Sequence, residues 1–319
     1  MAKIWGDKKY YSLNYFLREK FGEKVFKISL DAGFTCPNRD GTVSKGGCIF
    51  CSPRGSGDFC GSETDLVGQF QQGKEMMRKK WNKGKYIVYF QAYTNTYADV
   101  ATLREKYYSV LNMEDVVGIA IATRPDCLPE EVLDLLSEIN KKTYLWVELG
   151  LQTIHEDTAD FINRGYALDI YISAVRALKD RNIEVVTHAI LGLPREDKTK
   201  MLQTMDFIAN TGTQGIKLHL LHIMKETRLS KLYESGDMEV LEKDEYADLI
   251  IDCLEILPEN MVIHRITGDG PRATLIAPLW SIKKWEVINA IEDRFHARNT
   301  WQGKFYKENL RIMGLFASL

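Results

Sequence analysis

Four cysteines in the first fifth of the chain have the spacing of a metal or iron–sulfur site. Cys36 is followed by eleven residues and then by Cys48 and Cys51, which are separated by two residues; Cys60 comes eight residues later. Two cysteines at this separation on a tight turn direct both sulfur atoms toward one point. Thiolates packed together without a cation would repel one another, so the pattern predicts a bound thiophilic metal or cluster.

The last of these cysteines, Cys60, has two interpretations. As a fourth ligand it would favour structural zinc, because closed structural sites have four ligands and catalytic sites keep one position open. The glycines around it and the eight-residue gap indicate a loop instead. Tight zinc sites normally come as two Cys-x-x-Cys pairs, so we favour a thiol that is not a ligand.

Composition is that of an ordinary globular enzyme. The 319 residues are 45% hydrophobic and 27% charged, with a formal net charge of −2. Such a balance gives no general attraction for nucleic acid, so an RNA partner would need a local basic patch. Neither a signal peptide nor an apolar run of membrane-spanning length is evident, which predicts a cytoplasmic protein without a membrane partner. In a reducing compartment a metal site is favoured over disulfides.

Apolar patterns predict strands and helices in alternation along most of the chain. Short apolar runs are followed by segments whose apolar residues recur every three or four positions. Six or seven such units predict a parallel sheet, closed or half closed into a barrel. A doubly wound open sheet is the alternative. The sequence contains neither a Gly-x-Gly-x-x-Gly motif nor a phosphate loop that would support it. The predicted strands are 25–30, 86–90, 117–121, 144–149, 184–191, 215–221 and 261–266, and the predicted helices are 66–81, 99–111, 129–139, 167–180, 198–210, 244–257 and 285–298.

We therefore predict an α/β fold, a partial (β/α)6 barrel of the TIM type. The barrel would occupy residues 25–280, with helical extensions at residues 1–24 and 281–319. In such barrels the chemistry gathers where the strands end. Polar side chains follow the predicted strands at those points, and five of the six histidines, all but His296, lie near the same half of each unit. The polar residues there are Thr94, Asn95, Arg124, Glu148, Gln152, His155, His188, His219, His222, Lys225, His264 and Arg265.

These residues together resemble a known family. Three cysteines after the first strand of a barrel, with Phe50 before the last one, resemble the radical S-adenosylmethionine (radical SAM) superfamily. The usual first gap there is three residues, and a gap of eleven is closer to the branch of the elongator catalytic subunit. Residues 148–152 (ELGLQ) and 190–194 (ILGLP) resemble that branch and the oxygen-independent coproporphyrinogen oxidases. When the motifs at residues 55–59 and 267–271 are added to these, the chain resembles, over nearly its full length, one small bacterial family of the elongator-like branch.

The resemblance implies a cofactor set. Cys36, Cys48 and Cys51 would hold three irons of a [4Fe–4S] cluster, and S-adenosylmethionine would chelate the fourth iron through its amino and carboxylate groups. One electron from the cluster would split the sulfonium bond to give methionine and a 5′-deoxyadenosyl radical, which takes a hydrogen atom from the substrate.

The resemblance also implies residues that contact S-adenosylmethionine. Gln152 would bond the ribose, and Arg164 would pair with the methionine carboxylate, for which its planar fork is suited. The superfamily's glycine-rich loop after the second strand is replaced here, so Thr94 or Asn95 would take the amino group. Further cofactor-lining positions would be Glu148 and His188.

For the substrate, the resemblance implies tRNA. The reaction would remove the carboxymethyl part of a carboxymethylaminomethyl group on the wobble uridine and leave an aminomethyl group. Lys225, His222 and Arg265 would be the catalytic residues on the substrate side, with His219 and His264 beside them. Lys225 or Arg265 could pair with the carboxylate that is removed. An electron donor such as flavodoxin or ferredoxin would be a partner.

Two other classes of function stay open. One is a radical SAM enzyme acting on a small, porphyrin-like molecule, and the other is a zinc-stabilised RNA-binding protein without redox chemistry. Basic segments at residues 78–85 and 294–311, both with aromatic residues, are candidate RNA contacts. The first of these is better explained as a solvated helix C-terminus, where cations are favourable, so the second is the better RNA candidate.

Overall fold

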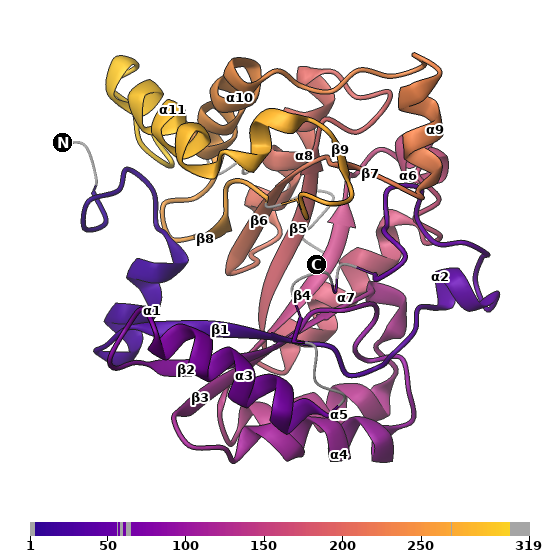
Figure 1. Cartoon of the computed structure of the whole chain (residues 1–319), viewed down its shortest axis with the longest axis vertical. Coiled ribbons are helices and arrows are strands. Elements are labelled where there is room, and N and C mark those ends of the chain that lie inside the picture. The colour runs from indigo at the N-terminus through magenta and orange to yellow at the C-terminus, as the bar shows by residue number, and fades with distance from the viewer. Residues whose placement is uncertain (1–3, 56, 58–59, 62–64, 269, 307–319) are drawn as a thin grey trace. The chain divides into compact units, whose positions relative to one another are not determined.

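The computed structural model describes residues 4–55, 57, 60–61, 65–268 and 270–306 (Figure 1). Strands and helices alternate along most of the chain, as predicted. The strands are β1 (Val25–Leu30), β2 (Lys85–Phe90), β3 (Val116–Thr123), β4 (Tyr144–Gln152), β5 (Glu184–Leu191), β6 (Gly215–Leu220), β7 (Ile223–Met224), β8 (Val262–Arg265) and β9 (Leu275–Ala277). The α-helices are α1 (Leu13–Phe21), α2 (Pro37–Asp40), α3 (Leu66–Arg78), α4 (Val100–Leu111), α5 (Glu130–Asn140), α6 (Glu156–Phe161), α7 (Leu168–Asp180), α8 (Lys198–Asn210), α9 (Arg228–Glu234), α10 (Lys243–Ile256) and α11 (Lys284–Ala297).

Seven strands form a sheet in the order β1-β2-β3-β4-β5-β6-β8, and β7 pairs with β9 in a separate antiparallel pair. The chain divides into two compact units. The cysteine unit comprises residues 16–150 and 164–186, and the histidine unit comprises residues 1–15, 151–163 and 187–319. The predicted boundaries after residues 24 and 280 remain a prediction.

In the cysteine unit, β1 to β4 are parallel, with one register shift between β2 and β3 at residues 86–87. Leu30 lies opposite Phe90, Phe90 opposite Ile121, and Ile121 opposite Val147. All four of these residues are buried, as expected of parallel strands covered on both faces. The register brings the carboxyl ends of the strands to one edge of the sheet, so the loops that follow them meet there.

Helices α3 and α4 pack beside β1 and β3 (Figure 1). Each begins at an aspartate whose side chain accepts a hydrogen bond from a backbone N–H of the first turn: Asp65 from Gly68, and Asp99 from Thr102. The predicted helix over 66–81 ends at Arg78. Trp81, predicted on its apolar face, lies beyond that end and is 48% exposed, packed against Phe26 with ring centroids 6.0 Å apart.

In the histidine unit, β6 and β8 pair in parallel, with Gly215 opposite Val262, and α10 packs against α11 (Figure 1).

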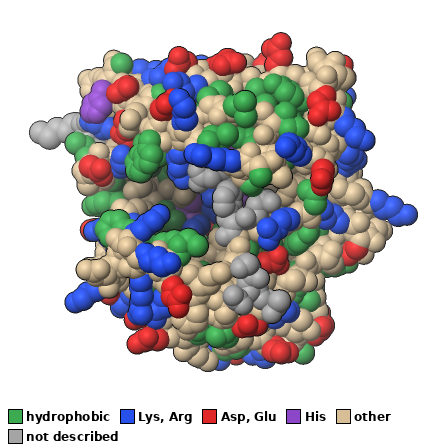
Figure 2. Space-filling model, viewed as in Figure 1, with side chains coloured by type: hydrophobic (Ala, Val, Ile, Leu, Met, Phe, Trp, Pro, Cys, Tyr) green, Lys and Arg blue, Asp and Glu red, His purple; other side chains and the backbone are tan. Residues whose placement is uncertain are grey.

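Charged side chains of both signs are interspersed over the visible surface (Figure 2). Within the described ranges, every helix is too short or too polar to span a bilayer.

Candidate active site

The cysteine loop, residues 36–60, follows β1 at the edge where the strands of the cysteine unit end. Cys36 directly precedes the short helix α2, and the backbone N–H of Cys51 donates to the carbonyl oxygen of Cys48 over 3.1 Å in a tight turn. Among the described residues the four cysteines of the loop form no disulfide, and each is partly exposed as a whole residue. Among the described residues, none are grouped as ligands of a single metal ion. The three thiolates of an iron–sulfur cluster bind three different irons and need not converge on one ion.

Asn38 connects the two parts of the cysteine loop. Its side chain is fully buried, and its Nδ2 donates to Sγ of Cys48 over 3.5 Å. Its carbonyl oxygen accepts a bond of 2.7 Å from the N–H of Gly47. Burial, followed by the neighbouring Cys51, raises the pKa of the Cys48 thiol to about 12. The thiol therefore keeps its proton until a bound cation displaces it.

Arg39 and Tyr93 fasten the cysteine loop to the loop after β2. The guanidinium of Arg39 donates to the carbonyl oxygen of Cys51 over 3.0 Å and lies 5.5 Å from the ring centroid of Tyr93. Tyr93 in turn donates from its hydroxyl to the carbonyl oxygen of Pro53, and its N–H donates to the carbonyl oxygen of Gly55. Tyr93 has a positive φ of 59°, a conformation that costs free energy for a bulky residue and is kept where surrounding contacts require it.

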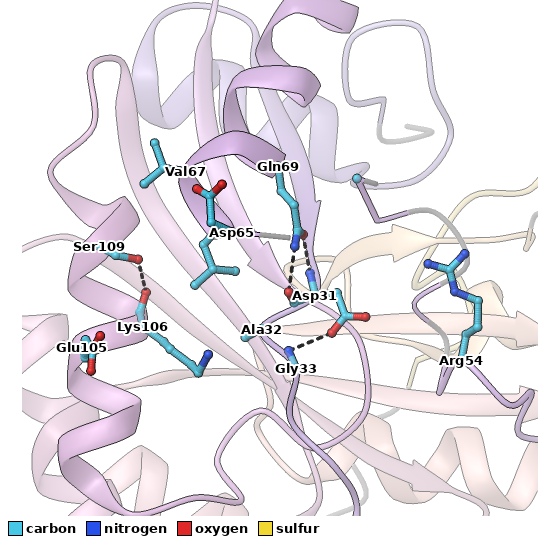
Figure 3. Close-up of a pocket in the computed structure, with 12 residues that line it drawn as sticks. Asp31, Ala32, Gly33, Arg54, Asp65, Val67, Gln69, Glu105, Lys106 and Ser109 are labelled. Atoms are coloured by element: carbon cyan, nitrogen blue, oxygen red, sulfur yellow. Dashed lines mark hydrogen bonds between the residues drawn. The ribbon is translucent and has the colours of Figure 1, made fainter. Parts of the chain in front are cut away.

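On the opposite side of the loop, a side chain of α3 fixes the exit from β1 (Figure 3). The Oε1 atom of Gln69 accepts from the N–H of Asp31 over 2.8 Å, and its Nε2 donates to the carbonyl oxygen of Asp31 over 2.9 Å. Asp31 also accepts from the N–H of Gly33 over 2.9 Å. A pocket of about 700 Å³ borders these residues and is also lined by Arg54 and Lys106. The paired bonds determine the direction in which the chain approaches Cys36.

The predicted S-adenosylmethionine residues Thr94 and Asn95 lie in the same unit and are buried. The N–H of Thr94 donates to the carbonyl oxygen of Thr35, next to the first cysteine. The Nδ2 of Asn95 donates to the carbonyl oxygens of Phe90 and Ala122, over 3.2 and 2.9 Å. Its Oδ1 is buried and has no hydrogen-bond partner among the described residues. A buried acceptor of this kind is suited to the amino group of a ligand.

Arg164, predicted to bind the carboxylate, is 1% exposed and belongs to a group of three stacked side chains. Its Nε donates to the carbonyl oxygen of Tyr166 over 3.0 Å, and its guanidinium lies 4.8 Å from the centroid of that ring. Arg124 lies at the same distance from the ring and donates to the carbonyl oxygen of Arg164 over 2.9 Å. Asp126 holds Arg124 through two bonds of 2.9 and 2.6 Å. Burial opposes ionisation of Arg124, but the bonds to Asp126 outweigh it and raise its pKa.

Glu148, another predicted cofactor-lining residue, is fully buried on β4. It accepts from Nε1 of Trp146 over 2.9 Å and lies 3.7 Å from Nζ of Lys27 on β1. The Lys27 ammonium also lies 4.4 Å from the ring centroid of Tyr89 on β2. Glu148 is thus held by an ion pair within the sheet of the cysteine unit, and its contact with a cofactor remains a prediction.

The remaining predicted residues belong to the histidine unit. His188 on β5 and His219 on β6 have ring centroids 4.9 Å apart. His222 lies beside Gly268, where an added Cβ would come within 3.0 Å of its ring. Lys225 donates to the carbonyl oxygen of Ala273 over 3.0 Å and is exposed. The other three predicted residues are Gln152, at the end of β4 with a φ of 68°, and His264 and Arg265, both partly buried on β8.

Sequence reasoning missed the roles of Arg124, Asp126 and Tyr166. The first two directly follow the apolar strand β3, separated by one proline. An arginine and an aspartate at this spacing after a strand are a weak signal of a paired, positioned guanidinium. Tyr166 carries no such signal, because its partners are a backbone carbonyl oxygen and two guanidinium groups, of which that of Arg124 is distant in sequence.

Comparison with known proteins identifies the family. A model described as the radical SAM superfamily matches residues 36–208, more than half of the chain, and a radical SAM C-terminal domain model matches residues 213–297. The chain belongs to the radical SAM superfamily.

Relatives of this radical SAM enzyme include YtqA from Bacillus subtilis (strain 168), which is 55% identical over 302 residues, 94% of each chain. Elongator complex protein 3 from Drosophila melanogaster is 27% identical over 168 residues, 51% of this chain and 30% of that protein. The solved structure of Elp3 from the archaeon Methanocaldococcus infernus covers 87% of this chain and 64% of its own, with a TM-score of 0.67 and 16% identity. These similarities confirm the elongator-like branch and the predicted partial-barrel fold class.

Membership of the superfamily implies a [4Fe–4S] cluster and S-adenosylmethionine, and the residues of the cysteine unit are suited to both. Cys36, Cys48 and Cys51 lie on one loop, and Asn38 donates an N–H to Sγ of Cys48, a kind of bond that tunes the reduction potential of a cluster. The unpartnered Oδ1 of Asn95 and the buried guanidinium of Arg164 match the two charged ends of an amino acid. When bound, this cofactor pair supplies one-electron cleavage of a sulfonium bond.

Proposed function

We propose that this radical SAM enzyme acts on tRNA, removing the carboxymethyl part of a carboxymethylaminomethyl group at the wobble uridine and leaving an aminomethyl group. Loss of a hydrogen atom and an electron from the carboxymethyl carbon would give a protonated imine, which water would hydrolyse to the amine and glyoxylate, with S-adenosylmethionine as the oxidant. The observation that carries the proposal is the similarity to Elongator complex protein 3, which runs over half of this chain. It agrees with the resemblance of the cysteine spacing and of residues 148–152 and 190–194 to the same branch.

In this proposal Cys36, Cys48 and Cys51 are the cluster ligands, and the amino acid end of S-adenosylmethionine binds Asn95 and Arg164. The burial of Asn95 and Arg164 favours their binding of the charged amino and carboxylate groups, because electrostatic contacts strengthen where water is excluded. Thr94, Glu148, Gln152 and His188 are the further predicted contacts. A flavodoxin or ferredoxin would supply the electron.

On the substrate side we propose Lys225, His222 and Arg265. The ammonium of Lys225 is exposed and held near Ala273 by a bond that a substrate carboxylate could replace. Arg265 offers a planar fork suited to the same carboxylate. His222, beside Gly268, is a candidate for proton transfer.

The test is a reaction of the reconstituted enzyme with S-adenosylmethionine, a reductant and tRNA that carries the carboxymethylaminomethyl group. Mass spectrometry of the nucleosides should show the aminomethyl product, and Cys48→Ala should abolish it. Cleavage of S-adenosylmethionine with unchanged tRNA would instead support a small-molecule substrate. A colourless protein that binds zinc and no iron would support the RNA-binding alternative.

A further inference from the structure

A pocket of about 450 Å³ in the histidine unit lies outside every residue assigned above. It is bordered by the segment after β5 and by the segment between α9 and α10, and Phe161 at the end of α6 also lines it. Its volume falls within the range of about 300–1,000 Å³ that is usual for ligand sites. The lining includes apolar side chains, among them Leu193, Leu232 and Leu241.

One wall of this pocket is a guanidinium stacked on an aromatic ring. The Cζ atom of Arg195 lies 3.9 Å from the ring centroid of Phe161. Arg195 has a φ of 70°, where glycine would be less strained. A strained residue at the mouth of a pocket is an observation from which function can be inferred. The stack offers a flat, cationic surface of the kind on which nucleobases stack in proteins that bind single-stranded RNA.

Charges around the pocket narrow the choice of ligand. The residues that line it include Glu196, Asp237, Glu239 and Glu245 besides Arg195. The carboxylates of Glu196, Asp237 and Glu245 each already accept a hydrogen bond from the chain, and the side chain of Glu239 is exposed. Several carboxylates would repel a phosphate, whereas the guanidinium would repel an organic cation. A neutral planar ring with N–H donors satisfies both, because it can stack on Arg195 and donate to a carboxylate.

We propose that this pocket binds an unpaired nucleobase with an exocyclic amino group, supplied by the RNA substrate. Adenine, cytosine and guanine have such an amino group, which donates to a carboxylate, and uracil is disfavoured because it has carbonyl oxygens instead. The proposal rests on the proposed function only in taking RNA as the source of the base.

Binding of labelled twelve-nucleotide oligocytidylate and oligouridylate to the reconstituted enzyme tests the proposal. The wild type should bind oligocytidylate more tightly than oligouridylate. Arg195→Gly should weaken oligocytidylate binding about tenfold, the effect of losing one stacked base, and reduce the difference between the two oligomers. Its melting temperature should equal or exceed that of the wild type, because glycine relieves the positive φ.

Asn182→Gly is the matched control. Asn182 has a φ of 56° and an exposed side chain in the cysteine unit, outside the residues that line this pocket. Its replacement introduces glycine at a similar positive φ, which asparagine tolerates better than arginine does, and should leave oligonucleotide affinity unchanged. Phe161→Leu keeps an apolar side chain but removes the ring, and should weaken oligocytidylate binding as Arg195→Gly does.

Several outcomes would overturn the proposal. A lower melting temperature of Arg195→Gly with unchanged affinity would make the stack structural. An equal loss for both oligomers that shrinks at high salt would make Arg195 a phosphate contact. Competition by free cytidine monophosphate as strong as that by oligocytidylate would make the ligand a free nucleotide. Because no turnover is measured, a failure of the tRNA reaction would leave this result interpretable.

Discussion

The guanidinium of Arg124 donates from Nη1 to the backbone carbonyl oxygen of Arg164 over 2.9 Å. This bond links the loop after β3 to the segment that carries Arg164, which is predicted to bind the carboxylate of S-adenosylmethionine. Tyr166 lies beside both guanidinium groups and donates its hydroxyl to the carbonyl oxygen of Gly150. Asp126 fixes Arg124 in turn. Arg124 is therefore a positioning residue for Arg164.

Arg124→Lys should weaken binding of S-adenosylmethionine. Lysine keeps the positive charge but lacks the fork that bonds Asp126 and the carbonyl oxygen of Arg164 together. Loss of a buried charged hydrogen bond costs about 1.5–3 kcal/mol, or roughly 10- to 150-fold in affinity. Equilibrium dialysis of the reconstituted enzyme measures it. Arg104→Lys, in an exposed pair with Glu138, is the control, and equal affinities for the two variants would contradict the positioning role.

Alanine replacements should separate the cluster ligands from the other thiols. Loss of Cys36, Cys48 or Cys51 should each abolish the visible absorption of the reconstituted enzyme and lower its iron content. Cys60→Ala should retain both, because an open coordination position is needed for S-adenosylmethionine. Iron and sulfide analysis measures the outcome, and a colourless Cys60 variant would make Cys60 a fourth ligand of the cluster and contradict the open coordination position.

Asn38→Ala should make the reduction potential of the cluster more negative. The Nδ2 of Asn38 donates to Sγ of Cys48, and hydrogen bonds to cluster sulfurs stabilise the reduced, more negatively charged form. Redox titration followed by electron paramagnetic resonance measures the shift. Asn140→Ala removes an exposed amide that bonds the carbonyl oxygen of Asn182, and it should leave the potential unchanged. An unshifted potential in both variants would argue against a role for the bond.

Much of the cysteine unit follows from local sequence. Apolar runs predicted β1 to β4 to within a few residues, and the parallel register then brings their ends together. The cysteine spacing indicated the cluster loop. Those inferences depend on residues near one another in sequence, because the geometry of a short segment limits the conformations that it can adopt.

Contacts between distant segments were not predictable in the same way. The bond from Arg124 to the carbonyl oxygen of Arg164 spans forty positions and uses a backbone acceptor, which any residue provides. Trp81 was wrongly placed on a helix because its spacing continues the apolar pattern of α3, although the helix ends at Arg78. The basic C-terminal segment proposed to contact RNA includes Lys307 and Arg311, which lie outside the described residues, as does Asp269 of the 267–271 motif.

Gly165 provides the last test, because it lies between Arg164 and Tyr166 and touches the cysteine loop. Its φ is 79°, and an added Cβ would lie 2.6 Å from Oδ1 of the buried Asn38. Gly165→Ala therefore combines backbone strain with a clash that must displace either the loop or the arginine segment. We expect the free energy of unfolding of the apoprotein to fall by about 2–3 kcal/mol.

Gly22→Ala separates the two contributions. Gly22 has a similar φ of 73°, and nothing lies within 4 Å of its added Cβ. This variant should lose only the strain contribution, about 1 kcal/mol, and should retain iron like the wild type. Gly165→Ala should in addition lose iron faster during dialysis, because the displaced Asn38 no longer supports Cys48. Urea denaturation measures the free energy of unfolding of both variants, and dialysis measures their iron release. Equal losses in Gly165→Ala and Gly22→Ala would mean that the loop accommodates the added methyl group without disturbing the cluster site.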